Sequence, residues 1–285
     1  MSEEQWKHQF VTVNGIKLHY VTQGEGPLML MLHGFPEFWY SWRHQIREFS
    51  QRYKVVALDM RGYNESDKPD GVEAYKVSEI AKDAAEVIKA LGYEQCVLVA
   101  HDWGGAIAWS FAYDYPSLVQ RLIVMNIPHP NLFMAGLRTP QQLMRSWYMF
   151  LFQLPWVPEF LLSSNNYQAI EQMFTEGSIN KQAFTPEDVA EYKRAVSQPG
   201  ALTAMLNYYR NIFSLSGDRS GVLAMPTLMI WGEEDIALGK ELTYGTERYV
   251  RNFQIHYIPN CGHWVQNEQP QLVNQYMWAF LGSPL

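Results

Sequence analysis

Three polar side chains that could do chemistry, Asp102, Asp235 and His263, each follow a short apolar run of this 285-residue sequence. A carboxylate can attack carbon as a nucleophile, and an imidazole that a second carboxylate orients can take a proton from water. Each residue also has an ordinary structural explanation, because Asp commonly caps helices or makes turns and His often forms loop hydrogen bonds. We expect the three to act together, because nucleophile, acid and histidine occur in the chain order of a known catalytic triad.

Asp102 stands where a predicted strand meets a predicted helix. Residues 96–100 are apolar and partly β-branched, as in a buried strand, and residues 106–115 are typical of a helix. Gly104 and Gly105 give the backbone room for a sharp, strained turn that pushes the Asp102 side chain outward. This is the pattern of a nucleophile elbow, whose usual sequence is G-x-S-x-G, with aspartate in place of serine.

A second site of interest is the loop His33-Gly34-Phe35-Pro36, which follows an apolar run at residues 28–32. In proteins with a nucleophile elbow, this loop supplies one backbone N–H of an oxyanion hole, and the residue after the nucleophile supplies the other. The two donors here would be Phe35 and Trp103. An ordinary tight turn is the alternative explanation of the loop.

The elements that must position these residues alternate between strands and helices. Residues 10–13 and 17–22 flank Asn14-Gly15, which predicts a β-hairpin. Further strands are predicted at residues 28–32, 54–58, 96–100, 121–125, 227–231 and 254–258, and helices begin near residues 77 and 270. The alternation indicates an α/β fold with a mostly parallel, doubly wound sheet, which binds ligands at the carboxyl ends of its strands. The elbow lies at such an end.

The alternation stops between residues 128 and 217. Helices are predicted at residues 140–152, 186–196 and 200–213, prolines punctuate the segment, and no run resembles a strand. We interpret residues 128–217 as a helical cap domain inserted into a core of residues 1–127 and 218–285. The apolar stretch at residues 147–162 is too short for a membrane span, which needs about 20 residues, so we expect it to pack on the core and line a pocket.

Composition narrows the classes of partner. The chain is 47% hydrophobic with a formal net charge of -7, so it can bury a large core and offers no basic surface to nucleic acid. Cys96 and Cys261 are too few for a disulfide framework, and the first residues lack the features of a signal peptide. Both observations favour a cytoplasmic location. The sequence contains no histidine cluster with metal-binding spacing.

Taken together, the motifs resemble one family. They are His33-Gly34-Phe35-Pro36, Ser41-Trp42-Arg43, Asp59-Met60-Arg61-Gly62-Tyr63, His101-Asp102-Trp103-Gly104-Gly105, Trp231-Gly232-Glu233-Glu234-Asp235 and Cys261-Gly262-His263-Trp264. From about residue 30 to residue 270, the chain is similar to the epoxide hydrolases of the α/β-hydrolase superfamily. Two residues depart from the family pattern. Ala100 replaces the usual glycine, and Asn64 is the second departure. Neither residue touches a reacting group.

The resemblance implies an α/β-hydrolase fold and a mechanism in two steps. Asp102 would attack an epoxide carbon to form an ester, and water activated by His263 would hydrolyse that ester, with Asp235 holding the imidazole. The amides of Phe35 and Trp103 would stabilise the oxyanion. The product would be a vicinal diol, and the reaction needs neither a cofactor nor a metal.

The resemblance also implies the remaining site residues. Tyr148 and Tyr209 match the two cap tyrosines that donate to the opening ring, and Tyr208 is a near neighbour of the second. Residues expected to line the substrate pocket are His33, Gly34, Pro36 and Trp264. The many apolar residues of the cap suggest a lipophilic or aryl epoxide as the small-molecule partner, and both a monomer and a homodimer fit the sequence.

Three alternatives remain open. A haloalkane dehalogenase would share the fold, the Asp-Trp elbow and the ester intermediate, but it typically carries asparagine where this chain has Phe35 and lacks the tyrosine pair. A haloacid or fluoroacetate dehalogenase fits less well, since it needs a cationic pocket. The chain could also be a non-catalytic ligand-binding protein on a hydrolase fold, although such a protein would have no need of an intact triad.

Overall fold

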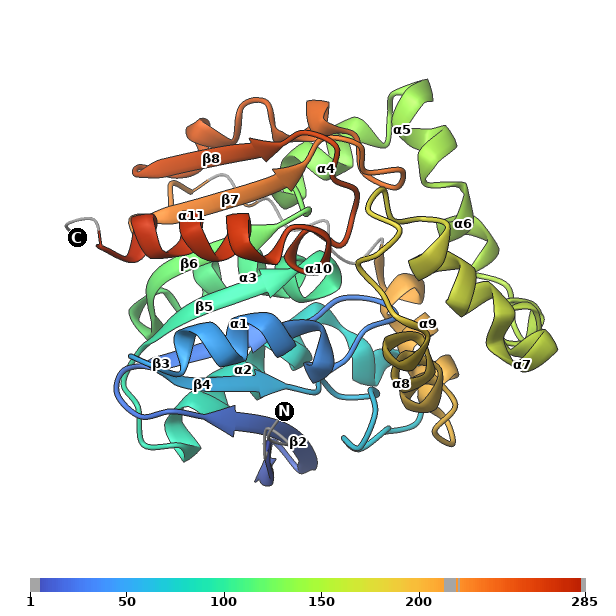
Figure 1. Cartoon of the computed structure of the whole chain (residues 1–285), viewed down its shortest axis with the longest axis horizontal. Helices are drawn as coiled ribbons and strands as arrows, with labels where there is room; N and C mark the ends of the chain where they lie inside the picture. The colour runs from blue at the N-terminus through green and yellow to red at the C-terminus, as the bar shows by residue number, and fades with distance from the viewer. Residues whose placement is uncertain (1–5, 213–218, 220, 283–285) are drawn as a thin grey trace.

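The computed structural model describes residues 6–212, 219 and 221–282. Its centre is an eight-stranded sheet in the order β1-β2-β4-β3-β5-β6-β7-β8 (Figure 1). Strand β2 is antiparallel to both of its neighbours, and the six strands that follow it in the sheet, including β3, are parallel to one another. The strands are β1 (Lys7–Val13), β2 (Ile16–Gln23), β3 (Leu28–Leu32), β4 (Lys54–Leu58), β5 (Cys96–His101), β6 (Val119–Met125), β7 (Thr227–Gly232) and β8 (Phe253–Ile258). The predicted mostly parallel, doubly wound sheet is confirmed.

The first two strands form the predicted hairpin. Val13 pairs with Ile16, so the turn consists of Asn14 and Gly15. Both turn residues have positive φ, 49° and 77°, as a type I′ turn requires. Glycine adopts this backbone without a steric cost, and asparagine tolerates it better than most residues. The local sequence therefore fixes this edge of the sheet.

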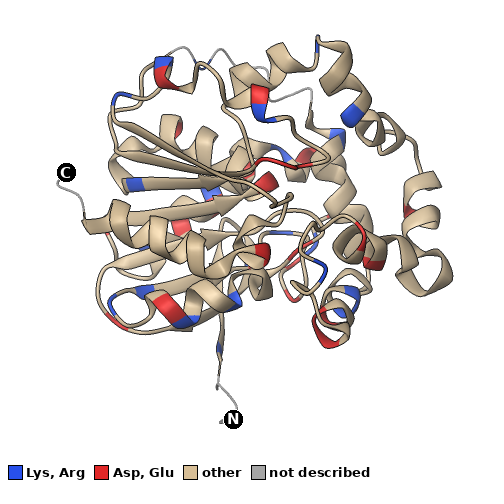
Figure 2. Cartoon of the chain, turned by 45° about the horizontal axis from the view of Figure 1, so that its top comes forward, with Lys and Arg blue, Asp and Glu red and all other residues tan. Residues whose placement is uncertain are grey.

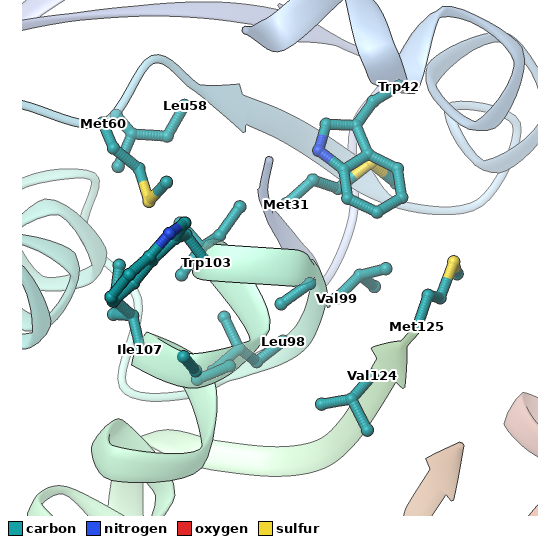
Figure 3. Packing of buried hydrophobic residues seen from close by; sticks show 14 of the residues in the cluster. Met31, Trp42, Leu58, Met60, Leu98, Val99, Trp103, Ile107, Val124 and Met125 are labelled. Carbon is teal, nitrogen blue, oxygen red and sulfur yellow. The ribbon is translucent and has the colours of Figure 1, made fainter. Parts of the chain in front are cut away.

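The central strands are buried because helices cover both faces of the sheet. In Figure 1, α1 (Arg43–Phe49) and α11 (Pro270–Gly282) lie in front of the strands, whereas α2 (Val77–Ala90) and α3 (Asp102–Asp114) lie behind them. Successive residues of a strand point to opposite faces. In Figure 3, Leu98 points toward Trp103 and Val99 points toward the side of Trp42. A strand with helices on both sides must therefore be apolar throughout, as β5 is.

The strand order brings two predicted loops together. The chain reverses its direction of winding between β3 and β5, which are neighbours in the sheet although β4 lies between them in sequence. A crevice forms at the carboxyl ends of strands at such a switch point. The loop of residues 33–36 follows β3 and the elbow follows β5, so both open into this crevice.

The described residues of the stretch predicted as a cap contain six helices, joined by turns and loops, and no strand. Its helices are α4 (Pro130–Gly136), α5 (Pro140–Arg145), α6 (Trp147–Leu151), α7 (Val157–Thr175), α8 (Pro186–Val196) and α9 (Ala201–Arg210). In Figure 1, α5 to α9 lie together beyond the carboxyl ends of the parallel strands. Within the part of the chain that the structure describes, every helix is too short or too polar to cross a membrane.

Some cap helices differ from the prediction. The predicted helix at 140–152 is two helices, because Ser146 leaves helical geometry between α5 and α6. Both α4 and α7 were missed, and α7 is itself interrupted by non-helical backbone from Ser164 to Tyr167. The helix predicted at 200–213 ends at Arg210, and its last predicted residue, like the predicted boundary at 217–218, lies outside the described residues. Short helices that end in tertiary contacts have weak local signals, so periodicity alone does not separate them.

A close approach of α3 to the sheet gives a testable consequence. A Cβ atom on Gly104 would lie 2.3 Å from the carbonyl oxygen of Leu32, which belongs to the backbone of β3 and cannot rotate away. We expect Gly104→Ala to lower the free energy of unfolding by about 1–3 kcal/mol, the usual cost of forcing extra volume into a packed interior. The measurement is urea unfolding followed by circular dichroism. Gly282→Ala is the matched control, because nothing lies within 4 Å of a Cβ there, and equal stability of the two variants would contradict this account of the elbow.

Candidate active site

Asp102 is the first residue of α3 and has a left-handed backbone, with a φ of 47°. This conformation is uncommon for a residue with a side chain and is typical of a strained turn. The carboxylate does not cap its own helix. Its Oδ1 accepts a 2.8 Å hydrogen bond from the backbone N–H of Phe35, across the crevice. The elbow therefore directs the carboxylate toward the loop after β3, and the N-cap explanation of Asp102 does not hold.

The structure brings Asp102, His263 and Asp235 together. His263 Nε2 lies 3.6 Å from Asp102 Oδ2, and His263 Nδ1 lies 2.7 Å from Asp235 Oδ2. Asp235 follows β7 and His263 follows β8, so both come from loops at the same edge of the sheet as the elbow. The order and spacing are those of a nucleophile, a base and an orienting acid.

The acid is held by a residue that sequence reasoning missed. Asn126, the residue after β6, donates from Nδ2 to Asp235 Oδ2 at 2.8 Å. Its Oδ1 accepts from the backbone N–H of Gly232 at 2.9 Å, so one amide ties the acid to the end of β7. The N–H groups of Ala237 and Leu238 donate to Asp235 Oδ1. A polar residue ending β6 at the carboxyl edge of the sheet was the signal that could have identified Asn126.

These contacts shift the pKa values of the three groups. Burial alone would raise the pKa of the Asp102 carboxyl, but hydrogen bonding and charge attraction from His263 outweigh it and lower that pKa. Burial opposes ionisation of Asp235 as well, and attraction to His263 again lowers its pKa. For His263, burial acts to lower the pKa, yet Asp235 and Asp102 raise it well above the ordinary value. The directions of these shifts favour an imidazolium between two carboxylates as the resting state of the site.

The two predicted oxyanion donors lie beside the nucleophile. The N–H of Phe35 points at Asp102, as its hydrogen bond shows. Trp103 is the second residue of α3, and the first four N–H groups of a helix have no partner within the helix. A charge developing on Asp102 Oδ1 would therefore meet an N–H donor already in place.

Four residues were expected to line the substrate pocket, and the structure places two of them at the wall of a cavity beside Asp102. Pro36 and Trp264 line it. His33 is fully buried beneath the loop, where its Nε2 accepts from the N–H of Met60 and its Nδ1 faces the carbonyl of Gly34. Gly34 backs directly onto Asp102, because a Cβ there would lie 2.4 Å from the Asp102 Cβ. These two residues shape the loop and do not line the cavity.

Glu37 is a second residue that the sequence analysis did not identify. Its carboxylate is fully buried and accepts from the N–H of Gly34 at 2.9 Å and from Gln266 Nε2 at 3.0 Å. His101 Nδ1 lies 2.7 Å from Glu37, while His101 Nε2 lies 2.8 Å from the backbone oxygen of His263. One buried carboxylate thus links the loop after β3, the elbow and the histidine loop.

A cavity above Asp102 has two lobes that share Asp102, Tyr148 and Tyr209. The outer lobe has a volume of about 280 Å³, and its other lining residues include Phe35, Pro36, Trp147, Ile236, His263 and Trp264. The inner lobe has a volume of about 40 Å³, and its other lining residues include Trp103, Ile127, Phe133, Met149 and Leu238. Both linings are almost wholly apolar, which is typical of a pocket for a small lipophilic molecule.

The two tyrosines reach this cavity from different helices. Tyr148 comes from α6 and Tyr209 from α9, and their ring centres are 5.9 Å apart. Burial and the nearby charge of Asp102 raise the pKa of Tyr148, and burial, Tyr148 and Asp102 raise the pKa of Tyr209, so both phenols are protonated at neutral pH. Tyr208 points elsewhere and donates to the backbone oxygen of Arg61 at 2.7 Å. The structure thus places Tyr209, and not Tyr208, beside Tyr148.

The site shows no arrangement for a metal ion within the described residues, since no group of three His, Cys, Asp or Glu side chains has the required geometry there. The groups that converge are an ionised carboxylate, an imidazole with its own carboxylate, backbone N–H donors and two neutral phenols. They can attack carbon, donate protons to oxygen and activate water.

Comparison with known proteins agrees with this geometry. A family model described as alpha/beta hydrolase fold matches residues 27–270, so the class of the protein is the α/β-hydrolase superfamily. Epoxide hydrolase 4 of Mus musculus is 46% identical over 284 residues, which is 96% of this chain and 79% of the mouse protein. AB hydrolase superfamily protein YfhM of Bacillus subtilis (strain 168) is 41% identical over 96% of this chain and 98% of its own.

A solved structure gives the same result. The crystal structure of Bacillus megaterium epoxide hydrolase in complex with an inhibitor superposes with a TM-score of 0.91 at 42% identity, covering 96% of this chain and 100% of that chain. The present chain belongs to the epoxide hydrolase family, as its sequence motifs predicted.

The shifted pKa of His263 predicts a pH dependence of stability. A raised pKa in the folded state stabilises the fold fully below the unfolded value of about 6.5, and the effect is lost as the pH rises through the folded value. We expect the difference in free energy of unfolding between the unmutated protein and His263→Gln to be largest near pH 6 and to shrink toward higher pH. Urea unfolding at a series of pH values measures it.

The control for this series is His256→Gln. Burial lowers the pKa of His256, so its difference from the unmutated protein should not shrink as the pH rises. If the His263 difference instead grows with pH, the imidazolium between the two carboxylates is not the resting state.

Proposed function

We propose that this chain hydrolyses a lipophilic epoxide to a vicinal diol through an ester on Asp102. The observation that carries the proposal is the convergence of Asp102, Tyr148 and Tyr209 on one apolar cavity. Ring opening needs a nucleophile at carbon and proton donors at the leaving oxygen, and these side chains are of the right kinds. The names of the similar proteins support the same reaction.

Aspartate suits the first step because the attacked carbon is saturated. A serine alkylated there would become an ether, which water does not readily cleave, whereas an alkylated aspartate is an ester. His263 keeps the pKa of Asp102 below its usual range, so the carboxylate is ionised and nucleophilic. The Phe35 N–H holds Oδ1, which leaves Oδ2 to bond to the epoxide carbon as the carbon–oxygen bond of the ring breaks.

The two tyrosines act on the other side of the breaking bond. The ring oxygen becomes an alkoxide and needs hydrogen bonds or a proton as it forms. Tyr148 and Tyr209 are neutral phenols on helices of the cap, opposite the nucleophile that the core supplies. They donate to this oxygen, and the product of the first step is a hydroxyalkyl ester.

Water completes the reaction at the acyl carbon of Asp102. Alkylation removes the negative charge of Asp102, which is one of the charges that raise the pKa of His263. The pKa of the imidazole therefore falls after the first step, so the ring releases its Nε2 proton to solvent and becomes neutral. The neutral ring then accepts a proton from water and passes it to the leaving diol oxygen, while Asp235 stabilises the imidazolium that forms in between. The bond between the acyl carbon and the alkyl oxygen breaks, so the diol leaves with an aspartate oxygen and water restores the carboxylate.

The cavity supports a substrate with one bulky apolar substituent. The outer lobe has about 280 Å³ of space beside the nucleophile, whereas the inner lobe has only about 40 Å³. A variant of the Bacillus megaterium enzyme has been solved with its product, (R)-3-[1]naphthyloxy-propane-1,2-diol, which is an aryl ether diol. We therefore propose a lipophilic or aryl epoxide as substrate.

The buried free thiols of Cys96 and Cys261 support a reducing, cytoplasmic location.

The nearest alternative is a haloalkane dehalogenase, and the tyrosines distinguish it. We expect Tyr148→Phe or Tyr209→Phe alone to slow alkylation by styrene oxide on the order of 10² to 10³, since each loses one acid or oxyanion donor. The double variant should lose nearly all alkylation. A halide leaves as a stable anion without a proton, so trace activity on a bromoalkane should be little changed. Single-turnover alkylation of both substrates measures these rates.

Tyr208→Phe is the matched control, because that phenol binds a backbone carbonyl and does not line the cavity. It should keep the alkylation rate of the unmutated enzyme. Rapid epoxide opening by the Tyr148 and Tyr209 double variant, or a strong effect of Tyr208→Phe, would show that the assigned ring-opening residues are wrong.

A second prediction separates the two steps. His263→Gln should still form the ester, because attack by Asp102 needs no base, but it should not hydrolyse the ester. The intact mass of the variant should rise by the mass of one substrate after incubation with styrene oxide. Asp102→Asn with the same substrate is the control and should gain no mass. An unmodified His263→Gln protein, with an epoxide that the unmutated enzyme consumes, would rule out this role for His263.

A further inference from the structure

Large apolar side chains are exposed together on the outer helices of the cap. Most of the exposed large hydrophobic residues among the described residues lie between positions 143 and 161. We call this set the apolar edge, and it consists of Leu143, Met144, Trp147, Phe150, Leu154, Trp156, Val157, Phe160 and Leu161. These residues belong to α5, α6, the turn after α6 and the start of α7, which follow one another along the outside of the cap (Figure 1).

Isolated exposed apolar residues are normal, but nine of them on consecutive elements along one side of a domain are unusual for a protein that faces only water. The exposed fractions are high, at 81% for Trp156, 72% for Met144 and 71% for Phe160. Trp156 also has a left-handed backbone, with a φ of 61°, which is unfavourable for a bulky side chain. A strained turn that exposes tryptophan to solvent indicates a surface with a role outside the folded chain.

The helix α6 is apolar on both of its sides. Tyr148 and Met149 line the active-site cavity, while Trp147 and Phe150 are 62% and 50% exposed. A helix that is apolar all round normally has apolar surroundings on every side. The cavity accounts for one side of α6, and the other side is largely open to solvent at Trp147.

The apolar edge carries little charge. Between residues 140 and 161 the charged residues are Arg145 and Glu159. Glu159 is paired with Arg210, whose Nη2 lies 2.9 Å from Glu159 Oε1. The outer cap helices at the right of Figure 2 accordingly show few charged segments. An uncharged edge with tryptophan and phenylalanine matches the boundary between lipid headgroups and acyl chains, where aromatic side chains are favoured.

The mouth of the active site opens at the same edge. Trp147 lines the outer lobe and is also part of the apolar edge, and Ile236, another lining residue of that lobe, is 60% exposed. A second protein seated on this edge would cover the mouth and exclude substrate. A lipid surface would instead supply lipophilic molecules to it.

We propose that the apolar edge binds to the surface of a lipid bilayer and that the outer lobe receives its substrate from the lipid. The side chains of Trp156 and Phe160 enter the interface, and none of the helices that the structure describes crosses the bilayer. The binding itself does not depend on the reaction, whereas delivery of an epoxide from lipid rests on the proposed function. Because the edge is nearly uncharged, binding to neutral lipid should change little with salt concentration.

The first test is flotation of the full chain with phosphatidylcholine vesicles. We expect the unmutated protein to float with the vesicles, and Trp156→Ser combined with Phe160→Ser to lower the partition coefficient about 10-fold or more, since two large apolar side chains leave the interface. Phe10→Ser combined with Tyr244→Ser is the matched control, because these aromatic residues are 44% and 57% exposed but lie outside the apolar edge. The control should float like the unmutated protein.

Three results would overturn the proposal. The first is an unmutated protein that stays in the lipid-free fraction, and the second is a control that loses as much binding as the edge variant does. In the third, the unmutated protein is a dimer by light scattering, the edge variant is a monomer, and neither floats, which would make this edge a protein interface.

A second readout separates this inference from the proposed function. On styrene oxide in solution, the edge variant should keep the kcat/KM of the unmutated enzyme, because Trp156 and Phe160 do not line the cavity. On a long-chain epoxide dissolved in vesicles, its rate should fall with its binding. If the unmutated enzyme hydrolyses no epoxide, the proposed function fails while flotation still decides whether the edge binds lipid. Equal rates of both enzymes on the vesicle substrate would refute delivery from lipid.

Discussion

The placement of one imidazole between two carboxylates is the interaction on which the rest of the site depends. A buried charge is unfavourable unless it is paired and hydrogen-bonded, and His263 meets this condition through Asp235 at 2.7 Å and Asp102 at 3.6 Å. The arrangement is asymmetric, because the nearer carboxylate is held by Asn126 and two backbone amides and the farther one faces the cavity. The same charges that stabilise the resting imidazolium make its pKa respond to modification of Asp102.

That placement requires a close approach of three strand ends. Asp102, Asp235 and His263 follow β5, β7 and β8, and a parallel sheet brings those ends to one edge. The close approach of α3 to the sheet requires glycine at position 104, where a Cβ would meet the backbone of β3. Glu37 then links the loop after β3 to His101 and to the histidine loop. Local strain at the elbow is therefore supported by a buried polar network as well as by apolar packing.

One short helix of the predicted cap, α6, lies both at the cavity and on the outside of the molecule. Tyr148 faces the nucleophile from α6, and Trp147 on the same helix lies both at the mouth of the cavity and on the outside of the molecule. Residues 147–162 are apolar in sequence, yet they do not form one buried face. Part of the stretch lines the cavity and part is exposed, so the amount of apolar sequence in this stretch exceeds what the described fold buries.

Much of the fold and of the site was predictable from local sequence. The hairpin at Asn14-Gly15, the apolar central strands and the elbow at Asp102 follow from backbone preferences and periodicity, which act over a few residues. The order of Asp102, Asp235 and His263 could be recognised because it is the chain order of a known catalytic triad. The family pattern favoured Tyr209 over Tyr208, and the structure places Tyr209 at the cavity. Tertiary structure alone decided that His33 supports a loop and that Asn126 and Glu37 hold the site. These outcomes depend on contacts between residues far apart in the chain, whose directions no local pattern encodes.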